Sequence, residues 1–559
     1  MKRIYKLSLV LLLVSTTLFT YAQKRYIGEI YSDAEIEVTS DVKFATNIDF
    51  LTSSFTDQAQ VVADLTAIKT ALFLQQPIPA THYDPGDASS KVKVTDLKMD
   101  IYKPKASVDN TTDRPVVVFI HTGNFLPPPI NGSPSGLKTD SSAIVLCQNW
   151  AKRGYVAISI DYRLGWNPLA ESVFERRGQL LNAVYRAIHD TKQAVRFVKD
   201  NAASYSIDPD KVVLYGEGSG AYVGLAYETL DKYPDMELPK FLNPLTQKSF
   251  IDTATVGLIE GWGGTLNLYA PSATSTEVQA VVSAGGALAD TSWLEAGDAP
   301  MISFQCVRDP FAPFNEGIVI VPTTNEDVVE VQGANLYIKK ANDLGNNDAI
   351  KNMKDETPYT AIARAKYGKT YDYIYTAPLD KITVNTGVEG LFPIIRPLGA
   401  SLTQNQAGPW QWWDPNSPLA TAIVQQPNIT AHLASLQSNP TMSPTQGRAY
   451  VDTIMGYMCP RVAVVLGYYG ASELSAKSVS QIPGTMMPNP ATNNVSIAFA
   501  PEVRIQKITI SDITGITVFE GAGFESNTAA ISLTDYSSGY YFINAQTSKG
   551  IWTGKLIKE

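Results

Sequence analysis

Histidine and cysteine are scarce in this chain of 559 residues, which contains four histidines and three cysteines. The cysteines, at positions 147, 306 and 459, are too few and too widely spaced for a disulfide framework or a structural zinc site. No group of histidines and carboxylates has the spacing of metal ligands. We therefore expect no metal and no other cofactor, and a metal-dependent hydrolase is the least favoured function.

Positive charge is also in deficit, because 45 lysines and arginines face 54 aspartates and glutamates, for a net charge of −9. A protein that binds nucleic acid needs a basic face for the phosphates, so we expect no nucleic-acid partner. The apolar fraction of 44% and the aromatic fraction of 10% are typical of a globular chain. The length predicts a large domain with an appended smaller one.

Long apolar runs are lacking except at the N-terminus. A basic segment at residues 2–6 is followed by an apolar run at residues 7–20 and by Ala22. This pattern predicts a secretory signal peptide over residues 1–22, with Gln23 as the first residue after cleavage. The polar residues that begin at Gln23 disfavour a membrane anchor, and the missing cysteine at the cleavage site disfavours a lipoprotein.

Short apolar runs alternate with helical patterns through the middle of the chain. The runs are rich in β-branched residues, as buried parallel strands are, and they cover residues 97–104, 116–120, 156–160, 212–215, 278–283 and 301–304. Helical periodicity lies between them at residues 141–153 and 183–203, and again at 448–465. The alternation predicts an α/β fold with a doubly wound, mostly parallel sheet, which binds ligands at the carboxyl ends of its strands.

A separate unit is predicted at the C-terminus. Residues 472–484 form a polar linker, and residues 485–559 alternate as strands separated by turn signals. We expect strands at residues 495–499, 505–510, 517–519 and 540–544, folded as a small antiparallel all-β sandwich. The remaining residues, 23–471, are assigned to the α/β domain with an N-terminal extension.

The C-terminal unit resembles the type A sorting domain of the type IX secretion system. Its matching features occur in order: Pro-Asn-Pro-Ala-Thr-Asn at 488–493, Ile-Thr-Ile-Ser-Asp-Ile-Thr-Gly at 508–515, Ser-Gly-Tyr-Tyr-Phe at 538–542, and Lys-Leu-Ile-Lys at 555–558. The resemblance implies export through the periplasm, with the secretion machinery as a partner and the outer-membrane surface or the medium as the destination.

Residues 97–314 resemble the carboxylesterase and feruloyl-esterase-like branch of the α/β-hydrolases. His-Thr-Gly-Asn-Phe at 121–125 stands where that family carries its His-Gly-Gly-Gly-Phe oxyanion loop, and Asp-Tyr-Arg-Leu at 161–164 matches a structural strand end. The resemblance makes Gly123, Asn124 and Gly220 candidates for the oxyanion hole, whose N–H groups stabilise a tetrahedral intermediate.

The nucleophile elbow is out of register. Residues 216–221 read Gly-Glu-Gly-Ser-Gly-Ala, so Gly216 and Gly220 frame a glycine, Gly218, where the family has its serine. Ser219 follows one residue later. Two interpretations remain open: Ser219 acts as a shifted nucleophile, or the nucleophile has been lost.

The resemblance places the triad acid at Asp309, in the segment Arg-Asp-Pro that follows a strand. The triad histidine of this fold follows the acid in the chain, and His432 is the only histidine after Asp309. His432 lies in what looks like the start of a helix. The segment 387–393 looks more like the expected histidine loop but carries Glu389.

Two functions are therefore weighed. The first is a secreted hydrolase of carboxylic esters, free or borne on a polysaccharide, with Ser219, Asp309 and His432 as catalytic residues. The second is an exported or surface-anchored binding protein that keeps the hydrolase cleft without catalysis, its pocket lined by tryptophans from the cluster at 410–413.

Overall fold

The computed structural model describes residues 25–320, 327–351, 353, 357–373, 380–396, 406–425, 427–470, 482–512, 517–524 and 526–559. The predicted signal peptide and most of the predicted linker lie outside these residues. The chain forms two compact units, which are described separately. The first takes in the described residues of Met1–Met353 and Thr357–Ser472, and the second those of Glu473–Glu559.

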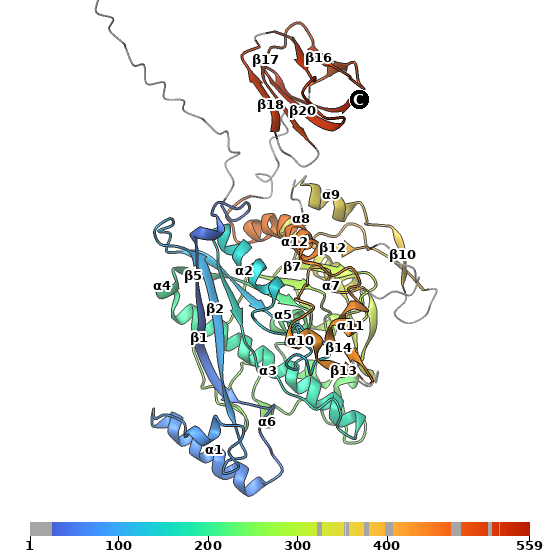
Figure 1. Ribbon diagram of the computed structural model, residues 1–559. Coiled ribbons are helices and arrows are strands. Elements are labelled where there is room, and N and C mark those ends of the chain that lie inside the picture. The colour runs from blue at the N-terminus through green and yellow to red at the C-terminus, as the bar shows by residue number, and fades with distance from the viewer. Residues whose placement is uncertain are drawn as a thin grey trace, which may run out of the picture. The chain divides into compact units, whose positions relative to one another are not determined.

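The first unit is built on an eight-stranded sheet in the order β1-β2-β4-β3-β5-β6-β7-β12 (Figure 1). Its strands are β1 (Ile36–Ile48), β2 (Val94–Pro104), β3 (Arg114–Ile120), β4 (Val156–Ile160), β5 (Ile207–Glu217), β6 (Ala280–Ala284), β7 (Met301–Cys306) and β12 (Leu391–Ile394). The β1–β2 and β2–β4 pairs are antiparallel, and every later neighbour is parallel. The five central strands β3 to β7 carry the β-branched runs, and nearly every residue in them is buried because helices cover both faces.

The helices that cover the sheet fall into two groups. Helix α2 (Ser141–Lys152) packs with α12 (Pro444–Val465), and α3 (Val173–Asp200) packs with α5 (Ser219–Thr229). Helix α7 (Ala334–Asp343) packs on β7. The hydrophobic core runs between the sheet and these helices and includes Val118, Ile158, Leu214 and Val281, all of them buried.

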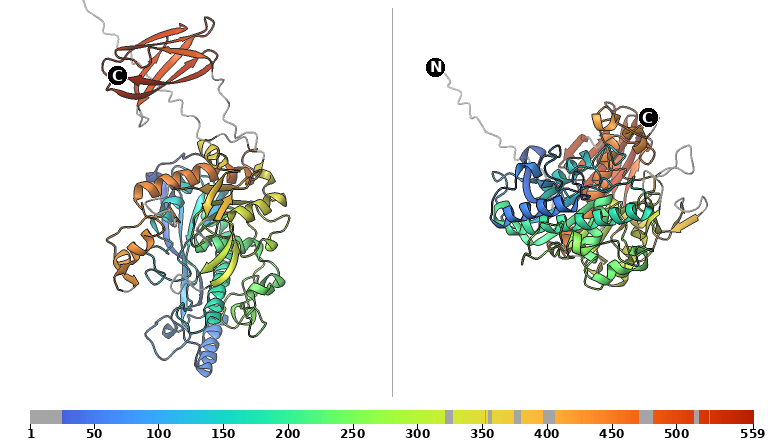
Figure 2. Two further views of the ribbon diagram at one scale, coloured as in Figure 1. Left: turned by 90° about the vertical axis from the view of Figure 1, so that its right-hand side faces the viewer. Right: turned by 90° about the horizontal axis from the view of Figure 1, so that it is seen from below.

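Shorter elements decorate this framework. Helix α1 (Gln58–Phe73) lies in the connection from the end of β1 to the start of β2 (Figure 2). The other helices are α4 (Ala202–Tyr205), α6 (Thr253–Val256), α8 (Asp348–Lys351), α9 (Pro358–Arg364), α10 (Pro418–Thr421) and α11 (Ala431–Leu436). Three small hairpins pair β8 (Glu316–Ile320) with β9 (Asp327–Gln332), β10 (Thr370–Tyr373) with β11 (Asp380–Thr383), and β13 (Ile423–Gln425) with β14 (Ile429–Thr430).

The second unit is an antiparallel sandwich of a three-stranded and a four-stranded sheet, ordered β15-β16-β19 and β18-β17-β20-β21. Its strands are β15 (Gly484–Met487), β16 (Asn494–Phe499), β17 (Ile505–Asp512), β18 (Thr517–Ala522), β19 (Thr528–Ser532), β20 (Gly539–Thr547) and β21 (Gly550–Lys558). Buried residues alternate along the strands and meet in a core that includes Val495, Ile497, Ile508 and Ile543.

The predicted fold class is confirmed: a mostly parallel sheet covered by helices is followed by an all-β unit. The predicted strand at residues 156–160 is β4 itself, whereas β5 begins five residues before its apolar run, at Ile207. None of the described helices combines the length and the apolar composition needed to cross a membrane.

Candidate active site

Three parallel strands, β3, β5 and β7, carry candidate residues at their carboxyl ends. The oxyanion-loop segment follows β3, the elbow follows β5, and Asp309 follows β7. At this end of the sheet, Thr122, Gly123, Asn124, Ser219 and Asp309 line one cavity of about 1090 Å³. The fold thus brings together four of the six candidates, and the other two, Gly220 and His432, do not line this cavity.

The elbow is formed, and a glycine stands at its apex. Gly218 has φ 54° and ψ −119°, a combination that side chains rarely adopt, and it precedes the first residue of α5. Its N–H donates to Ala284 O at 2.9 Å, and its carbonyl accepts from Ala221 N at 3.0 Å. The strained turn that presents a nucleophile in this fold is therefore present, but residue 218 has no side chain to present.

Thr122 fills the place where the side chain of residue 218 would stand. An ideal Cβ on Gly218 would lie 2.2 Å from Thr122 Oγ1 and 2.9 Å from Thr122 Cβ. Real Cβ atoms do not approach other atoms that closely, so a serine at 218 would require Thr122 to shift. The two departures from the family pattern, Thr122 and Gly218, thus lie against each other in the structure.

Ser219 lies beyond the apex, at the first position of α5, and it is 7% exposed. Its Oγ accepts a hydrogen bond of 3.1 Å from the backbone N–H of Asn124. Asn124 has φ 52°, and its carbonyl accepts from Trp166 Nε1 at 2.9 Å, so the loop holds its N–H toward the hydroxyl. The backbone N–H of Asn124, which the resemblance assigned to the oxyanion hole, therefore donates to the hydroxyl of Ser219 instead.

The remaining oxyanion candidates differ in position. Gly123 lines the cavity beside Asn124, whereas Gly220 is absent from the described residues that line it. Gly220 instead packs against the end of β3, where an ideal Cβ would lie 2.1 Å from Ile120 O. Its place in the structure is that of a packing residue between α5 and β3.

Asp309 is 2% exposed and accepts two backbone hydrogen bonds at Oδ1, from Phe311 N at 2.9 Å and Ala312 N at 3.1 Å. In the described part of the chain its carboxylate forms no ion pair, neither with Arg308 nor with an imidazole. Burial raises the pKa of Asp309 to about 7, although the two N–H groups lower it. A buried carboxyl that lacks a cation takes up a proton near neutral pH.

This raised pKa predicts a pH-dependent stability. Between the ordinary aspartate pKa and about pH 7 the folded state binds more protons than the unfolded state, so stability falls as the pH rises through that window. We expect Asp309→Asn to raise the free energy of unfolding by about 1–3 kcal/mol at pH 8 and to change it little at pH 4. Denaturant titrations at the two pH values measure this.

The exposed Asp343→Asn, which removes the same charge from the end of α7, is the control and shifts stability by less than about 0.5 kcal/mol. A variant Asp309→Asn that is less stable than the parent at pH 8 contradicts the assignment.

His432 stands apart from the other candidates. It is the second residue of α11, and its Nδ1 accepts a hydrogen bond of 3.1 Å from Trp413 Nε1. Among the described residues it does not line the cavity and makes no hydrogen bond or ion pair with Asp309 or Ser219. The structure therefore brings Ser219 and Asp309 to one cavity and leaves His432 outside it.

An indole stands beside Asp309. An ideal Cβ on Gly285 would lie 3.6 Å from Asp309 Oδ2 and 3.5 Å from Trp410 Cζ2, so the carboxylate and the indole flank the same point. Trp410 is 1% exposed and, with Trp413, lines the cavity, whereas Trp412 packs over Gly447 outside it. The tryptophan cluster at 410–413 thus contributes two residues, Trp410 and Trp413, to the lining of the cavity.

A second buried carboxyl, Glu217, precedes the elbow at the end of β5. Its Oε1 accepts hydrogen bonds from Gln411 Nε2 at 2.5 Å and from Ser142 Oγ at 3.3 Å. Burial raises the pKa of Glu217 to about 7, although these neighbours lower it. Sequence analysis gave Glu217 no role beyond its place in the segment 216–221, and its distant partner Gln411 could not be inferred from spacing.

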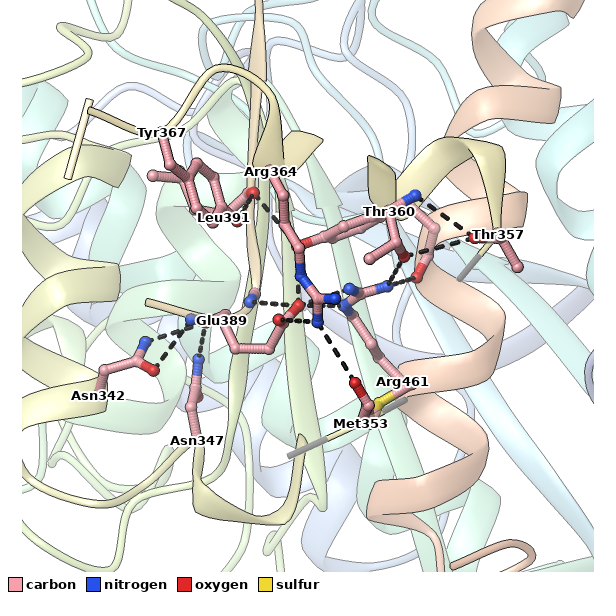
Figure 3. Close-up of polar contacts among 12 residues, drawn as sticks. Asn342, Asn347, Met353, Thr357, Thr360, Arg364, Tyr367, Glu389, Leu391 and Arg461 are labelled. Carbon is pink, nitrogen blue, oxygen red and sulfur yellow. Dashed lines mark hydrogen bonds and ion pairs between the residues drawn. The ribbon is translucent and has the colours of Figure 1, made fainter. Parts of the chain in front are cut away.

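Glu389 lies before the amino end of β12, in a network of ion pairs and hydrogen bonds. It precedes β12, so the expectation that residues 387–393 form a histidine-type loop after the last strand is wrong. Arg461 Nη2 donates to Glu389 Oε1 at 2.5 Å and Arg364 Nη2 to Oε2 at 3.0 Å, in a network that Figure 3 shows. Asn342 and Asn347 hold its carbonyl at 2.9 and 2.7 Å.

The cavity is mostly apolar. Polar residues at the strand ends and at residues 411–439 share the lining with an apolar wall from α3 that includes Leu180, Val184 and Ile188. Among the described lining residues the only acidic or basic side chain is that of Asp309. No cluster of three or more histidine, cysteine or acidic residues that could hold a metal occurs in the described ranges.

Comparison with known proteins identifies two regions. Residues 99–294 match the BD-FAE family model, and residues 485–559 match that of the secretion system C-terminal sorting domain. The chain thus contains an α/β-hydrolase domain with esterase and lipase homologues and a type IX sorting domain. The sorting domain indicates export to the cell surface or the extracellular space.

Individual relatives match over short stretches. Secreted lipase 5 of Gibberella zeae is 31% identical over 155 residues, which are 26% of each chain. Neuroligin-like protein glit-1 of Caenorhabditis elegans is 30% identical over 125 residues, 22% of this chain and 15% of the relative. The bile salt-activated lipase of Rattus norvegicus is 30% identical over 138 residues, 24% and 21%. The chain therefore spans about a quarter or less of the length of these relatives.

Among solved structures, the apo form of Thermogutta terrifontis esterase 2 is 21% identical, with a TM-score of 0.27, over 45% of this chain and 76% of the esterase.

Proposed function

We propose that this exported protein binds an apolar small molecule in the cavity at the strand ends and does not hydrolyse it. The observation that carries the proposal is the apex of the elbow, where Gly218 offers no nucleophile and the side chain of Thr122 fills the vacated place. Two of the relatives are named lipases, so a fatty-acid ester is the first substrate to test here.

The surroundings of Ser219 support binding without turnover. A serine attacks a carbonyl only when a neighbouring base removes its proton, and in the described residues no imidazole contacts Ser219. Tyr162, which stacks on His121 at 4.3 Å between ring centroids, lies near the hydroxyl, but burial raises the pKa of Tyr162. Burial likewise lowers the pKa of His121 to about 4, and its Nδ1 faces Thr122 O at 2.5 Å.

The cavity supports binding because its walls are already formed. Its volume of about 1090 Å³ is slightly above the usual range for small-molecule sites, and its lining combines many apolar residues with a smaller set of polar ones. Trp166, Trp410 and Trp413 line it, so occupancy is expected to change tryptophan fluorescence.

The test measures turnover and binding on the same sample. We expect no release of p-nitrophenol from p-nitrophenyl octanoate above the level of the Ser219→Ala variant, because neither protein holds an activated nucleophile. We also expect 1-octanol to quench or shift the tryptophan fluorescence saturably and to raise the melting temperature.

The matched binding control is Val184→Phe, which adds a ring to the cavity wall on α3 and should weaken octanol binding. Hydrolysis that disappears in Ser219→Ala would overturn the proposal and favour a shifted serine nucleophile instead.

The division of the chain belongs to the same proposal. A signal peptide over residues 1–22 and a linker over 472–484 would deliver residues 23–471 as the binding domain, with residues 485–559 recognised by the type IX secretion machinery. Secretion of a fusion that carries only residues 472–559 behind a signal peptide tests the last assignment.

A further inference from the structure

Asp309 is the only residue with an acidic or basic side chain among the described residues that line the cavity. Its Oδ1 accepts two backbone N–H groups, whereas Oδ2 makes no hydrogen bond to any described residue. In a triad this second oxygen holds an imidazolium, and no described imidazole or other cation takes that place here.

We infer that the cavity binds a ligand with an apolar body and one ammonium group, and that the ammonium pairs with Asp309 in the place left by the missing imidazolium. The inference rests on the proposed function, since it names the chemistry of the molecule that is bound and not turned over. A buried charge is stable in a protein only when it is paired, and a ligand cation supplies that pair.

The neighbours of Asp309 fit a cation. Atoms Cζ2 and Cη2 of Trp410 flank the same point as Asp309 Oδ2, so an apolar group next to a paired ammonium has an aromatic surface to pack on. Ser219 and Thr122 line the same cavity and carry hydroxyl oxygens that can accept from the N–H groups of an ammonium. A carboxylate in a cavity that also offers hydroxyl oxygens and an indole suits a ligand with an ammonium group.

The wider charge distribution points the same way. Behind the elbow, burial raises the pKa of Glu217 to about 7, and burial together with the charge of Glu217 raises the pKa of Asp140 to about 7. His121, whose pKa is lowered to about 4, is neutral at pH 7. Arg308, beside Asp309 in the chain, is absent from the described lining. None of these groups brings a positive charge to the described lining, so no cation is available there to pair with a carboxylate, sulfate or phosphate ligand.

Three probes with the same eight-carbon chain separate the head groups: octylammonium chloride, 1-octanol and sodium octanoate. Their affinities for the full chain are measured at pH 8, where Asp309 is mainly ionised, by calorimetry and by tryptophan fluorescence. We expect octylammonium to bind at least about 10-fold more tightly than octanol, and octanoate more weakly than either. Octylammonium should also lose its advantage at pH 5, where Asp309 is protonated.

Two variants decide whether Asp309 is responsible. In Asp309→Asn the octylammonium advantage should vanish while octanol binds as before. Glu228→Gln is the matched control, because it removes a partly buried carboxylate from α5 at a position outside the described lining, and it should keep the advantage.

The outcomes also separate this inference from the proposed function. Octanol binding with no preference for octylammonium, or a preference that survives Asp309→Asn, would overturn the ammonium site and leave binding without turnover intact. Hydrolysis of p-nitrophenyl octanoate that depends on Ser219 would overturn the proposed function whichever head group binds best.

Discussion

Replacing Glu389 by glutamine is expected to lower the free energy of unfolding by about 3–5 kcal/mol, because it removes the buried carboxylate that pairs with the guanidinium of Arg461. Arg461 is fully buried, and both its Nε and Nη2 donate to Glu389 Oε1. Burial alone would raise the pKa of Glu389, but the charges of Arg461 and Arg364 outweigh burial and lower it. Urea unfolding of the parent and variant, followed by tryptophan fluorescence, measures the loss.

The pH dependence of this pair has the opposite sign to that of Asp309. Because the pKa of Glu389 in the folded state is below its ordinary value, its contribution is present at neutral pH and disappears as the pH falls below about 4.5. The difference between the parent and Glu389→Gln should therefore shrink in acid.

Two controls accompany Glu389→Gln. Glu295→Gln, which removes an exposed partner of Lys232, should change stability by less than about 0.5 kcal/mol. The double variant Glu389→Leu with Arg461→Met should recover most of the loss, since both buried charges are then removed. A loss below about 1 kcal/mol in Glu389→Gln would show that the network is not essential to the fold.

The second large effect is expected at Gly220. A Cβ at this position would lie 2.1 Å from Ile120 O and 2.6 Å from His121 O. Both contacts are to backbone, so no side chain can move aside and α5 must shift away from β3. We expect Gly220→Ala to destabilise the first unit by more than about 4 kcal/mol and to disturb the elbow. The melting temperature and octanol binding measure the two consequences.

Gly224→Ala on the same helix is the matched control for Gly220→Ala. Its Cβ would meet Val281 Cγ1 at 3.6 Å, an ordinary contact, and alanine favours the helix by up to about 1 kcal/mol. Equal effects of the two substitutions would mean that the close approach of α5 to β3 is not rigid.

The sheet was predictable because its central strands are buried on both faces. Such strands must be apolar along their whole length, so the runs that became β3, β4 and β7 stand out from the helical patterns around them. Helix α3 was placed ten residues too late, starting at residue 183. Its first turns carry Glu175, Arg177 and Gln179, which hide the apolar stripe, and the capping role of Ser172 is not distinctive in the sequence.

The candidate site was predictable only in part. Local patterns placed the elbow and the acid because glycine spacing and strand ends leave a signature in the sequence. The overlap between Thr122 and a side chain at 218, the approach of Trp410 to Asp309 and the bond from Gln411 to Glu217 all join distant segments. Nothing local specifies such contacts.

The overlap between Thr122 and residue 218 has a consequence for how this chain can change over generations. A serine introduced at position 218 alone would meet Thr122 and force its side chain to shift, and a glycine introduced at 122 alone would supply no nucleophile. Two substitutions are therefore needed to place an unobstructed serine at the apex of the elbow.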